Sequence, residues 1–310
     1  MVGSIEDLLK WTRLVRMETN LFRPEGVARP PSALLVVRGE DSFDFLQSQG
    51  TADLRPCLQG QIRYGLWLDH KGLIHADGRI WRAGNGDWWI LSEYIGAEVL
   101  REKFERHIIA DDVELIDRTS GWELLSLDAL PASFAPKDKA SPQSLDAGWY
   151  LGSSQIWSGG VDVLLPTPAT EVIPILSRSP AMVDLARLQA GVPLVGRDIE
   201  LGRWNPFEAG LMGAVSLLKG CFLGQEVVAR AHRLGRRSTR FVTAVSEQTP
   251  DLPEAPCPLL VDGQQVGEWT SLARSEETVW ALGWLKTRFP DGSVDFDSGG
   301  RWAVQTIDLG

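Results

Sequence analysis

The clearest chemistry in the sequence lies where two glycines, Gly220 and Gly224, bracket a thiol, Cys221, and an aromatic ring, Phe222. The glycines predict turns, so we expect both side chains to be exposed. A helix is expected to begin near Gln225. Its first-turn amide groups are unpaired donors at a partially positive helix end, which favours an anion or lowers the pKa of a nearby thiol.

Lys219 precedes this run and would act on the thiol in the same direction. Cys221 is therefore interpreted as a nucleophile or a redox-sensitive thiol. The alternative is a small buried residue at a tight turn. The neighbouring lysine and glycines favour a functional role, and the residues leave its nature open.

The run from Lys219 to Glu226 resembles the KGC-aromatic-x-GQE hallmark of the YgfZ-like folate-binding proteins, which are relatives of the glycine-cleavage T protein, an aminomethyltransferase. Other stretches look like the N-terminal helix, the hairpin, the helix-to-loop element and the C-terminal barrel of this superfamily. The resemblance implies that Cys221 and Lys219 are the chemically active groups. His70 and His75 make no metal-ligand spacing with Asp69, so no metal site is expected. The resemblance also implies a folate site formed by Gln49, Thr51, Asp53, Asp69, Lys71, Arg187, Gln189, Gly220, Phe222, Gly224, Gln225, Glu226 and Arg230.

Two departures from the transferase pattern bear on catalysis. Transferases have paired aspartates in the strand after the hairpin glycine, and the matching residues here are His75 and Ala76. Asp77 lies one residue late, which places its side chain on the strand face opposite Ala76. Gln189 stands where the transferases have a glutamate, so the charge that would pair with a pterin edge is lost. In contrast, the segment 205–211 is closer to the transferases.

The resemblance therefore implies a protein that binds tetrahydrofolate or a derivative and supports the maintenance of iron-sulfur enzymes, including those that modify tRNA. Its expected partners are the folate and iron-sulfur proteins. The alternative function is a folate-dependent aminomethyltransferase, which would transfer a one-carbon unit to tetrahydrofolate.

Hydrophobic periodicity predicts the elements that must position these residues. A short apolar strand is expected at 34–37, then a helix from 41 to about 54. Alternating patterns and turn signals predict an antiparallel meander. The meander strands are expected at 62–69, 73–81 and 88–91. The remaining expected elements are a helix at 95–108, strands at 113–117 and 122–127, a loop at 130–143 and a helix at 180–191.

Short alternating runs after residue 240 predict a small β-barrel or sandwich. The charge balance changes at the same point, from six Lys and Arg against one Glu in 219–240 to four against eleven acidic residues in 241–310. With the resemblance, the expected fold is α+β: two antiparallel-sheet and helix lobes in residues 1–240, of which about 55–120 form the inserted lobe, and a C-terminal β-barrel in 241–310.

Composition excludes several classes of protein. The net charge of −10 disfavours a general nucleic-acid coat, and three widely spaced cysteines argue against zinc ribbons, cluster ligation and disulfide frameworks. A mixed helix is expected at 2–17 in place of a signal peptide, and no run of apolar residues is long enough for a membrane span, so a cytoplasmic location without membrane contact is expected. Nucleotide-binding glycine fingerprints are absent from the sequence.

Two sets of residues keep alternative interpretations. Arg230, Arg233, Arg236, Arg237 and Arg240 either form a solvated helix end whose cations offset the helix dipole or a site for an acidic partner, such as a polyglutamate tail or an RNA backbone. The thirteen tryptophans are interpreted as core residues, with a stacking platform for a pterin as the alternative.

Overall fold

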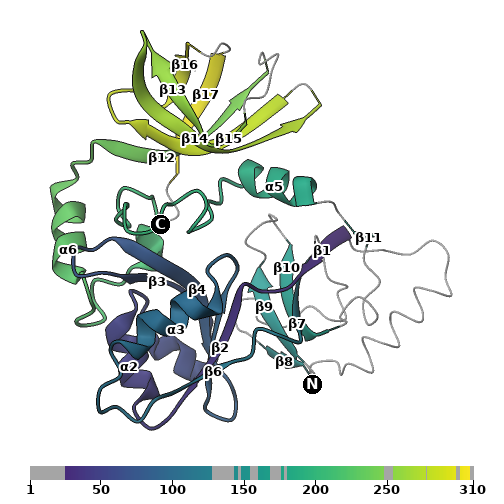
Figure 1. Ribbon diagram of the computed structural model, residues 1–310, viewed down its shortest axis with the longest axis vertical. Helices are drawn as coiled ribbons and strands as arrows, with labels where there is room; N and C mark the ends of the chain where they lie inside the picture. Colours follow the sequence, from purple (N-terminus) through teal and green to yellow (C-terminus); the bar gives the residue numbers. More distant parts are fainter. Residues whose placement is uncertain are drawn as a thin grey trace. The chain divides into compact units, whose positions relative to one another are not determined.

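The computed structural model describes residues 25–127, 143–145, 148–153, 160–167, 176–177, 180–247, 254–276, 278–297 and 301–307 (Figure 1). The predicted helix at 2–17 and nearly all of the predicted loop at 130–143 lie outside them. The chain divides into two compact units. Unit 1 comprises Met1–Gln47, Asp53–Tyr64 and Gly78–Val183, and unit 2 comprises Ser48–Ala52, Gly65–Asp77 and Asp184–Gly310. The domain bounds expected from the sequence remain a prediction.

The three strands of the predicted meander and the strands predicted at 34–37 and 113–117 form a five-stranded sheet with the order β3-β4-β5-β2-β6. The strand ends differ from the predicted ends by one or a few residues, and the division between the units falls within β3 and β4. The sheet consists of β2 (Ala33–Arg38), β3 (Arg63–Leu68), β4 (Ile74–Arg82), β5 (Trp88–Ser92) and β6 (Glu114–Asp117), and α3 (Ala97–Glu105) lies between β5 and β6 in the chain.

The helix predicted from 41 to about 54 is shorter than expected. Helix α2 (Ser42–Gln49) stops before Gly50, which pairs with Trp67 as an isolated β-bridge. A separate 3-10 helix, η1 (Arg55–Gln59), follows with Pro56 in its first turn. Because Gly50 is held in β-pairing with Trp67, one continuous helix to residue 54 cannot form, and Pro56 is tolerated in the first turn of η1, where its missing N–H has no helical partner to lose.

A six-stranded sheet in unit 1 has the order β11-β1-β7-β10-β9-β8. Its strand β7 has the predicted bounds. The strands are β1 (Glu25–Arg29), β7 (Trp122–Leu127), β8 (Gln143–Leu145), β9 (Gly148–Ser153), β10 (Val161–Pro166) and β11 (Leu176–Ser177). A buried cluster joins residues of both sheets, namely Leu34, Trp81, Leu91, Leu124, Leu151 and Leu164. The two sheets of unit 1 therefore share one hydrophobic core.

Buried charges also connect the strands of unit 1. Arg79 donates to Asp162 at 2.7 Å and to Glu93 at 2.8 Å, and Arg29 pairs with Glu93 from β1. Burial by itself would raise the pKa of Glu93, but the Arg29 and Arg79 guanidinium groups hold it below its usual range. The cations thus compensate carboxylates that would otherwise be costly to bury.

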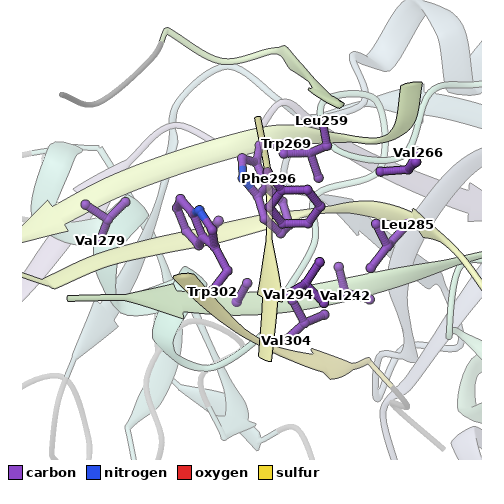
Figure 2. Close-up of a cluster of buried hydrophobic side chains, with 12 residues drawn as sticks. Val242, Leu259, Val266, Trp269, Val279, Leu285, Val294, Phe296, Trp302 and Val304 are labelled. Carbon is purple, nitrogen blue, oxygen red and sulfur yellow. The ribbon is translucent and has the colours of Figure 1, made fainter. Parts of the chain in front are cut away.

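Unit 2 contains helices α5 (Pro180–Gln189, except its first four residues) and α6 (Gln225–Leu234) and a curled six-stranded antiparallel sheet (Figure 1). The sheet has the order β13-β14-β15-β12-β17-β16 and is consistent with the barrel expected from the sequence. Its strands are β12 (Thr239–Ser246), β13 (Cys257–Val261), β14 (Gln264–Ser275), β15 (Thr278–Lys286), β16 (Gly292–Asp295) and β17 (Arg301–Thr306). Figure 2 shows Trp269, Phe296 and Trp302 packed together in its concave core.

Tryptophans occupy core positions in both units. Trp67, Trp81, Trp88 and Trp269 belong to the largest fully buried side chains of the described residues. For these four residues the structure confirms the interpretation as core side chains. Their large apolar area makes them major contributors to the hydrophobic stabilisation of the fold.

A buried ion pair ties α5 to the C-terminal sheet. The Arg187 Nη1 atom donates to Asp198 Oδ2 at 2.8 Å, and the Arg187 Nη2 atom donates to the Ser271 hydroxyl at 2.7 Å. Asp198 also accepts hydrogen bonds from the hydroxyls of Ser271 and Thr270 in β14. Because Asp198 is almost fully buried, its carboxylate depends on the Arg187 guanidinium and on these hydroxyls for compensation.

We expect the substitution Asp198→Ala to lower the free energy of unfolding by about 3–5 kcal/mol, because it removes the fully buried carboxylate from the Arg187 guanidinium and leaves the partly accessible Asp184 as its counter-ion. Urea unfolding followed by tryptophan fluorescence would measure the change. The matched control is Asp295→Ala, which removes a carboxylate from an exposed ion pair with Arg301 and should change stability little. Equal effects of the two substitutions would contradict the role given to Asp198.

Candidate functional site

The glycine-flanked run forms the loop that leads into α6. Gly220 and Gly224 both have positive φ, 116° and 81°, and α6 begins directly after Gly224 at the expected residue. Cys221 is exposed as expected. Phe222 is buried, in contrast to the expectation, because its ring packs 5.6 Å from the Lys219 ammonium inside the unit. The loop therefore presents the thiol and withdraws the aromatic ring.

Lys219 is buried with only 8% of its surface accessible. Its Nζ atom donates to the carbonyl oxygens of Gly50 and Ala52 at 2.6 and 2.7 Å. Two carbonyl dipoles thus compensate the charge of the ammonium in place of water. These contacts give Lys219 a structural role within unit 2. Its action on the Cys221 thiol stays a prediction.

Thr51 lies between those two carbonyl-bearing residues and is fully buried. Its hydroxyl donates to the Ala214 carbonyl at 2.7 Å and accepts from the Leu66 N–H at 2.9 Å. We refer to Gly50, Thr51, Ala52, Ala214 and Lys219 as the Thr51–Lys219 cluster. It joins the segment after α2, the strand β3 and the loop before α6 into one structure.

Gly224 brings the β3–β4 hairpin against the start of α6. A Cβ atom at this position would lie 2.5 Å from the Asp69 carbonyl oxygen and 2.9 Å from the Gly72 Cα. Gly72 in turn faces Val227 and Val228 of α6. Only a residue without a side chain permits this approach, so both glycines are explained by packing.

Asp69 organises the hairpin from within. Its Oδ1 atom accepts from the Lys71 and Leu73 N–H groups at 2.8 and 2.9 Å, and its Oδ2 atom lies 3.3 Å from His75 Nε2. Burial alone would raise the pKa of Asp69, but the hydrogen bonds from Leu73, Lys71 and His75 lower it below its ordinary value. A fixed, ionised carboxylate therefore sits beside the loop before α6.

Other predicted folate contacts lie at separate places. Arg187 is inaccessible, and besides its bonds to Asp198 and Ser271 its Nε atom donates to Asp184 at 2.8 Å. Gln189, Glu226 and Arg230 are exposed, and Gln49 and Gln225 are half-buried, with the Gln225 amide 3.5 Å from the Leu217 carbonyl. Asp53 belongs to unit 1. There the Arg55 guanidinium and the Gln47 amide hold the pKa of Asp53 well below its usual range.

Known proteins resemble the chain both in sequence and in structure. Residues 33–133 match the family model described as the GCVT N-terminal domain. The sequence is 28% identical to the tRNA-modifying protein YgfZ of Cronobacter sakazakii over 244 residues, 70% of each chain, and 26% identical to its Escherichia coli counterpart over 240 residues, 72% of each chain. The crystal structure of aminomethyltransferase T of the glycine cleavage system from Bartonella henselae superposes with a TM-score of 0.77 at 20% identity, covering 97% of this chain and 88% of that one.

The chain resembles the YgfZ proteins in sequence and shares the fold of the glycine-cleavage T protein, so it is YgfZ-like. Its sheet-rich architecture with few helices among the described residues matches the aminomethyltransferase fold. The resemblance found from the hallmark run and the shorter stretches around it is thereby confirmed.

Burial alternates along β4 at the positions where the transferases carry their paired aspartates. Ala76 is fully buried, whereas His75 and Asp77 are partly accessible. This alternation confirms that Asp77 faces the side of the strand opposite Ala76. It also shows that Asp77 shares the face of His75, the other position matched to a transferase aspartate. The YgfZ-like chain thus keeps a carboxylate on one face of this strand and has a methyl group on the other.

Two contacts of this YgfZ-like chain were not foreseen from its sequence. Asp198 accepts from the Leu194 N–H and from two hydroxyls besides pairing with Arg187, yet it is a single aspartate in a loop without periodicity. The hydroxyl of Thr51 is shared between residues that lie 15 and 163 positions away. Such long-range partners leave no local signal in the sequence.

The thiols of the described residues differ strongly in accessibility. Cys57 is buried, and burial raises its pKa to about 12, whereas Cys221 is exposed. Within the described ranges, no set of three or more His, Cys, Asp and Glu side chains is arranged to hold a metal ion. No helix in those ranges combines the length and apolar character needed to cross a bilayer.

We expect Gly224→Ala to destabilise the YgfZ-like chain by clearly more than Gly263→Ala. Both residues have positive φ, which costs an alanine about 1–2 kcal/mol, but only the Gly224 Cβ would overlap other atoms. The clash adds about 1–3 kcal/mol. Urea unfolding of the two variants would measure the difference, and equal losses would show that the hairpin does not press against Gly224.

Proposed function

We propose that this YgfZ-like chain is a cytoplasmic protein that binds tetrahydrofolate or a derivative and supports the maintenance of iron-sulfur enzymes, including those that modify tRNA. The name of its relatives, tRNA-modifying protein YgfZ, supports the link to tRNA. The T-protein fold supports a folate-type ligand. The iron-sulfur part of the proposal depends on the resemblance of the hallmark run.

One observation carries the proposal. Three stretches that are far apart in the sequence, each with residues predicted to bind folate, meet in unit 2. Thr51 bonds to Ala214 and lies between the carbonyls that hold Lys219, and Asp69 touches Gly224. The hallmark run therefore lies against the other two predicted segments, as a shared ligand site requires.

The side chains left accessible around this meeting point suit a folate. Lys71 and Arg230 are exposed cations that could pair with the carboxylates of a glutamate tail. Gln225 and Glu226 offer oxygen acceptors for the N–H groups of a pterin. When bound, the folate would supply a nitrogen-borne carrier for a one-carbon unit, while these residues would bind and orient it.

The same arrangement divides the hallmark run into two roles. Lys219, Phe222 and Gly224 are used in internal packing, while Cys221 and Glu226 remain at the surface. Packing residues explain how the loop is held, and they leave the exposed thiol without a structural reason. Cys221 is therefore the residue of the run that we assign to the supporting function.

We expect tetrahydrofolate to quench the tryptophan fluorescence of the purified chain in a saturable titration. Glu226→Ala should weaken this binding at least tenfold, because it removes an exposed charged acceptor that a pterin N–H would use. Glu247→Ala, an exposed glutamate after β12, serves as the control. A chain that shows no binding would overturn the folate proposal.

The transferase alternative is tested with the same protein. Tetrahydrofolate-dependent release of ammonia from an aminomethyl-lipoyl carrier at an ordinary enzyme rate would replace the proposed function with aminomethyl transfer. Folate binding without turnover would support the proposal.

We expect Cys221→Ala to leave tetrahydrofolate affinity nearly unchanged and to abolish the rescue of iron-sulfur enzyme activity in cells that lack their own YgfZ protein. The exposed thiol contributes no packing, so the variant should fold normally. Cys257→Ala, a half-buried thiol in β13, is the matched control and should retain rescue. Full rescue by Cys221→Ala would remove the thiol from the proposed function.

A further inference from the structure

The outer face of α6 carries arginines that no neighbour neutralises. Arg230, Arg233 and Arg236 are exposed, and none forms an ion pair with another described residue. Glu226 is the acidic residue of this helix. The surface around these guanidinium groups is therefore strongly positive.

This lack of partners stands out within the chain, whose net charge is −10. Most other arginines of the described residues pair with a carboxylate, including Arg29, Arg38, Arg55, Arg79, Arg101, Arg106, Arg187, Arg197, Arg203, Arg240 and Arg301. A chain rich in acidic residues thus leaves three neighbouring arginines unpaired on one helix and its C-terminal end.

Large apolar side chains are exposed among these arginines. Val227 is 43% and Leu234 is 59% accessible, and they lie seven residues apart, so they project from one side of the helix. Arg230 falls between them in the sequence. Val228, about 100° around the helix from Val227, is fully buried. We refer to Val227, Arg230, Arg233, Leu234 and Arg236 as the α6 surface.

The helix that carries this surface is held rigidly within unit 2. The close contact of Gly224 with the hairpin anchors its first turn, and Gly235, in the left-handed conformation, donates to the carbonyls of Ala231 and His232 at its end. A preformed surface loses little conformational entropy when it binds a partner.

We propose that the α6 surface is a docking site for an acidic, amphipathic segment of a partner protein. Carboxylates of such a segment would pair with the arginines, and its apolar side chains would cover Val227 and Leu234. A phosphate backbone would use the arginines but would leave the apolar side chains uncovered, and the negative charge of the whole chain would repel a long polyanion. The proposal goes beyond folate binding, and Arg230 is the residue that the α6 surface shares with the proposed folate site.

The size and exposure of the α6 surface determine the kind of binding. A helix of ten residues is about 15 Å long and contacts about three turns of a partner helix. Exposed charge pairs are individually weak and are screened by salt. The site therefore supports transient binding that depends strongly on ionic strength.

The test uses the full chain and a fluorescein-labelled peptide of two Glu-Glu-Leu-Leu-Glu-Glu-Leu repeats. Fluorescence anisotropy should show saturable binding that weakens steeply as salt rises from about 50 to about 500 mM. The double substitution Arg230→Glu with Arg233→Glu should weaken binding at least tenfold. Leu234→Ser should weaken it severalfold without a change in charge.

The matched control is Arg82→Glu with Arg118→Glu, two exposed arginines of unit 1 without ion-pair partners among the described residues. This variant has the same net charge as the α6 double variant and should bind the peptide within twofold of the unmodified chain. An equal loss in both double variants would show that overall charge is responsible, and it would overturn the proposal.

Two further outcomes would overturn it. Absence of saturable binding of the acidic peptide would leave the arginines as a solvated helix end. Tighter binding of a labelled RNA hairpin than of the peptide, with no effect of Leu234→Ser on either probe, would identify the α6 surface as a nucleic-acid site.

Discussion

The burial of one ammonium group constrains much of unit 2. Lys219 cannot lose its water shell unless fixed dipoles replace it, and the Gly50 and Ala52 carbonyls do so from 169 and 167 positions away. The Thr51 hydroxyl holds the intervening residue through Ala214 and Leu66. A short segment after α2 is thereby tied to the loop before α6, and both ends of the hallmark run acquire defined positions.

The residues of the hallmark run differ in the physical role that each has in the fold. Lys219 supplies a buried charge, while Gly224 supplies the space for the Asp69 carbonyl at the hairpin. Neither residue needs a ligand to account for it. Cys221 and Glu226, at the surface of the same loop, are held in place by these contacts without taking part in them. The loop therefore combines a rigid scaffold with accessible chemistry, which is the arrangement that binding sites on loops require.

The helix that follows extends the same principle. Helix α6 is fixed within unit 2 by its buried side and by the contact of Gly224, directly before its first turn, with the hairpin. Its remaining side can therefore carry charges that the fold itself does not use. Elsewhere in unit 2 the fold does use its charges, as the buried pair of Arg187 and Asp198 shows. An arginine in this protein is structural where carboxylates and hydroxyls surround it and available for a partner where they do not.

Local sequence was sufficient for the strands of the meander, for strand β7 and for the start of α6, because alternation, turn glycines and helix starts depend on neighbouring residues. It was also sufficient for the family, through the uninterrupted run from Lys219 to Glu226. The tertiary structure alone decided that α2 ends at Gln49, that Phe222 is buried, and that the Arg187 guanidinium donates hydrogen bonds to Asp198 and Ser271. These outcomes depend on partners that are distant in the chain, and no pattern of adjacent residues encodes which buried group will meet which.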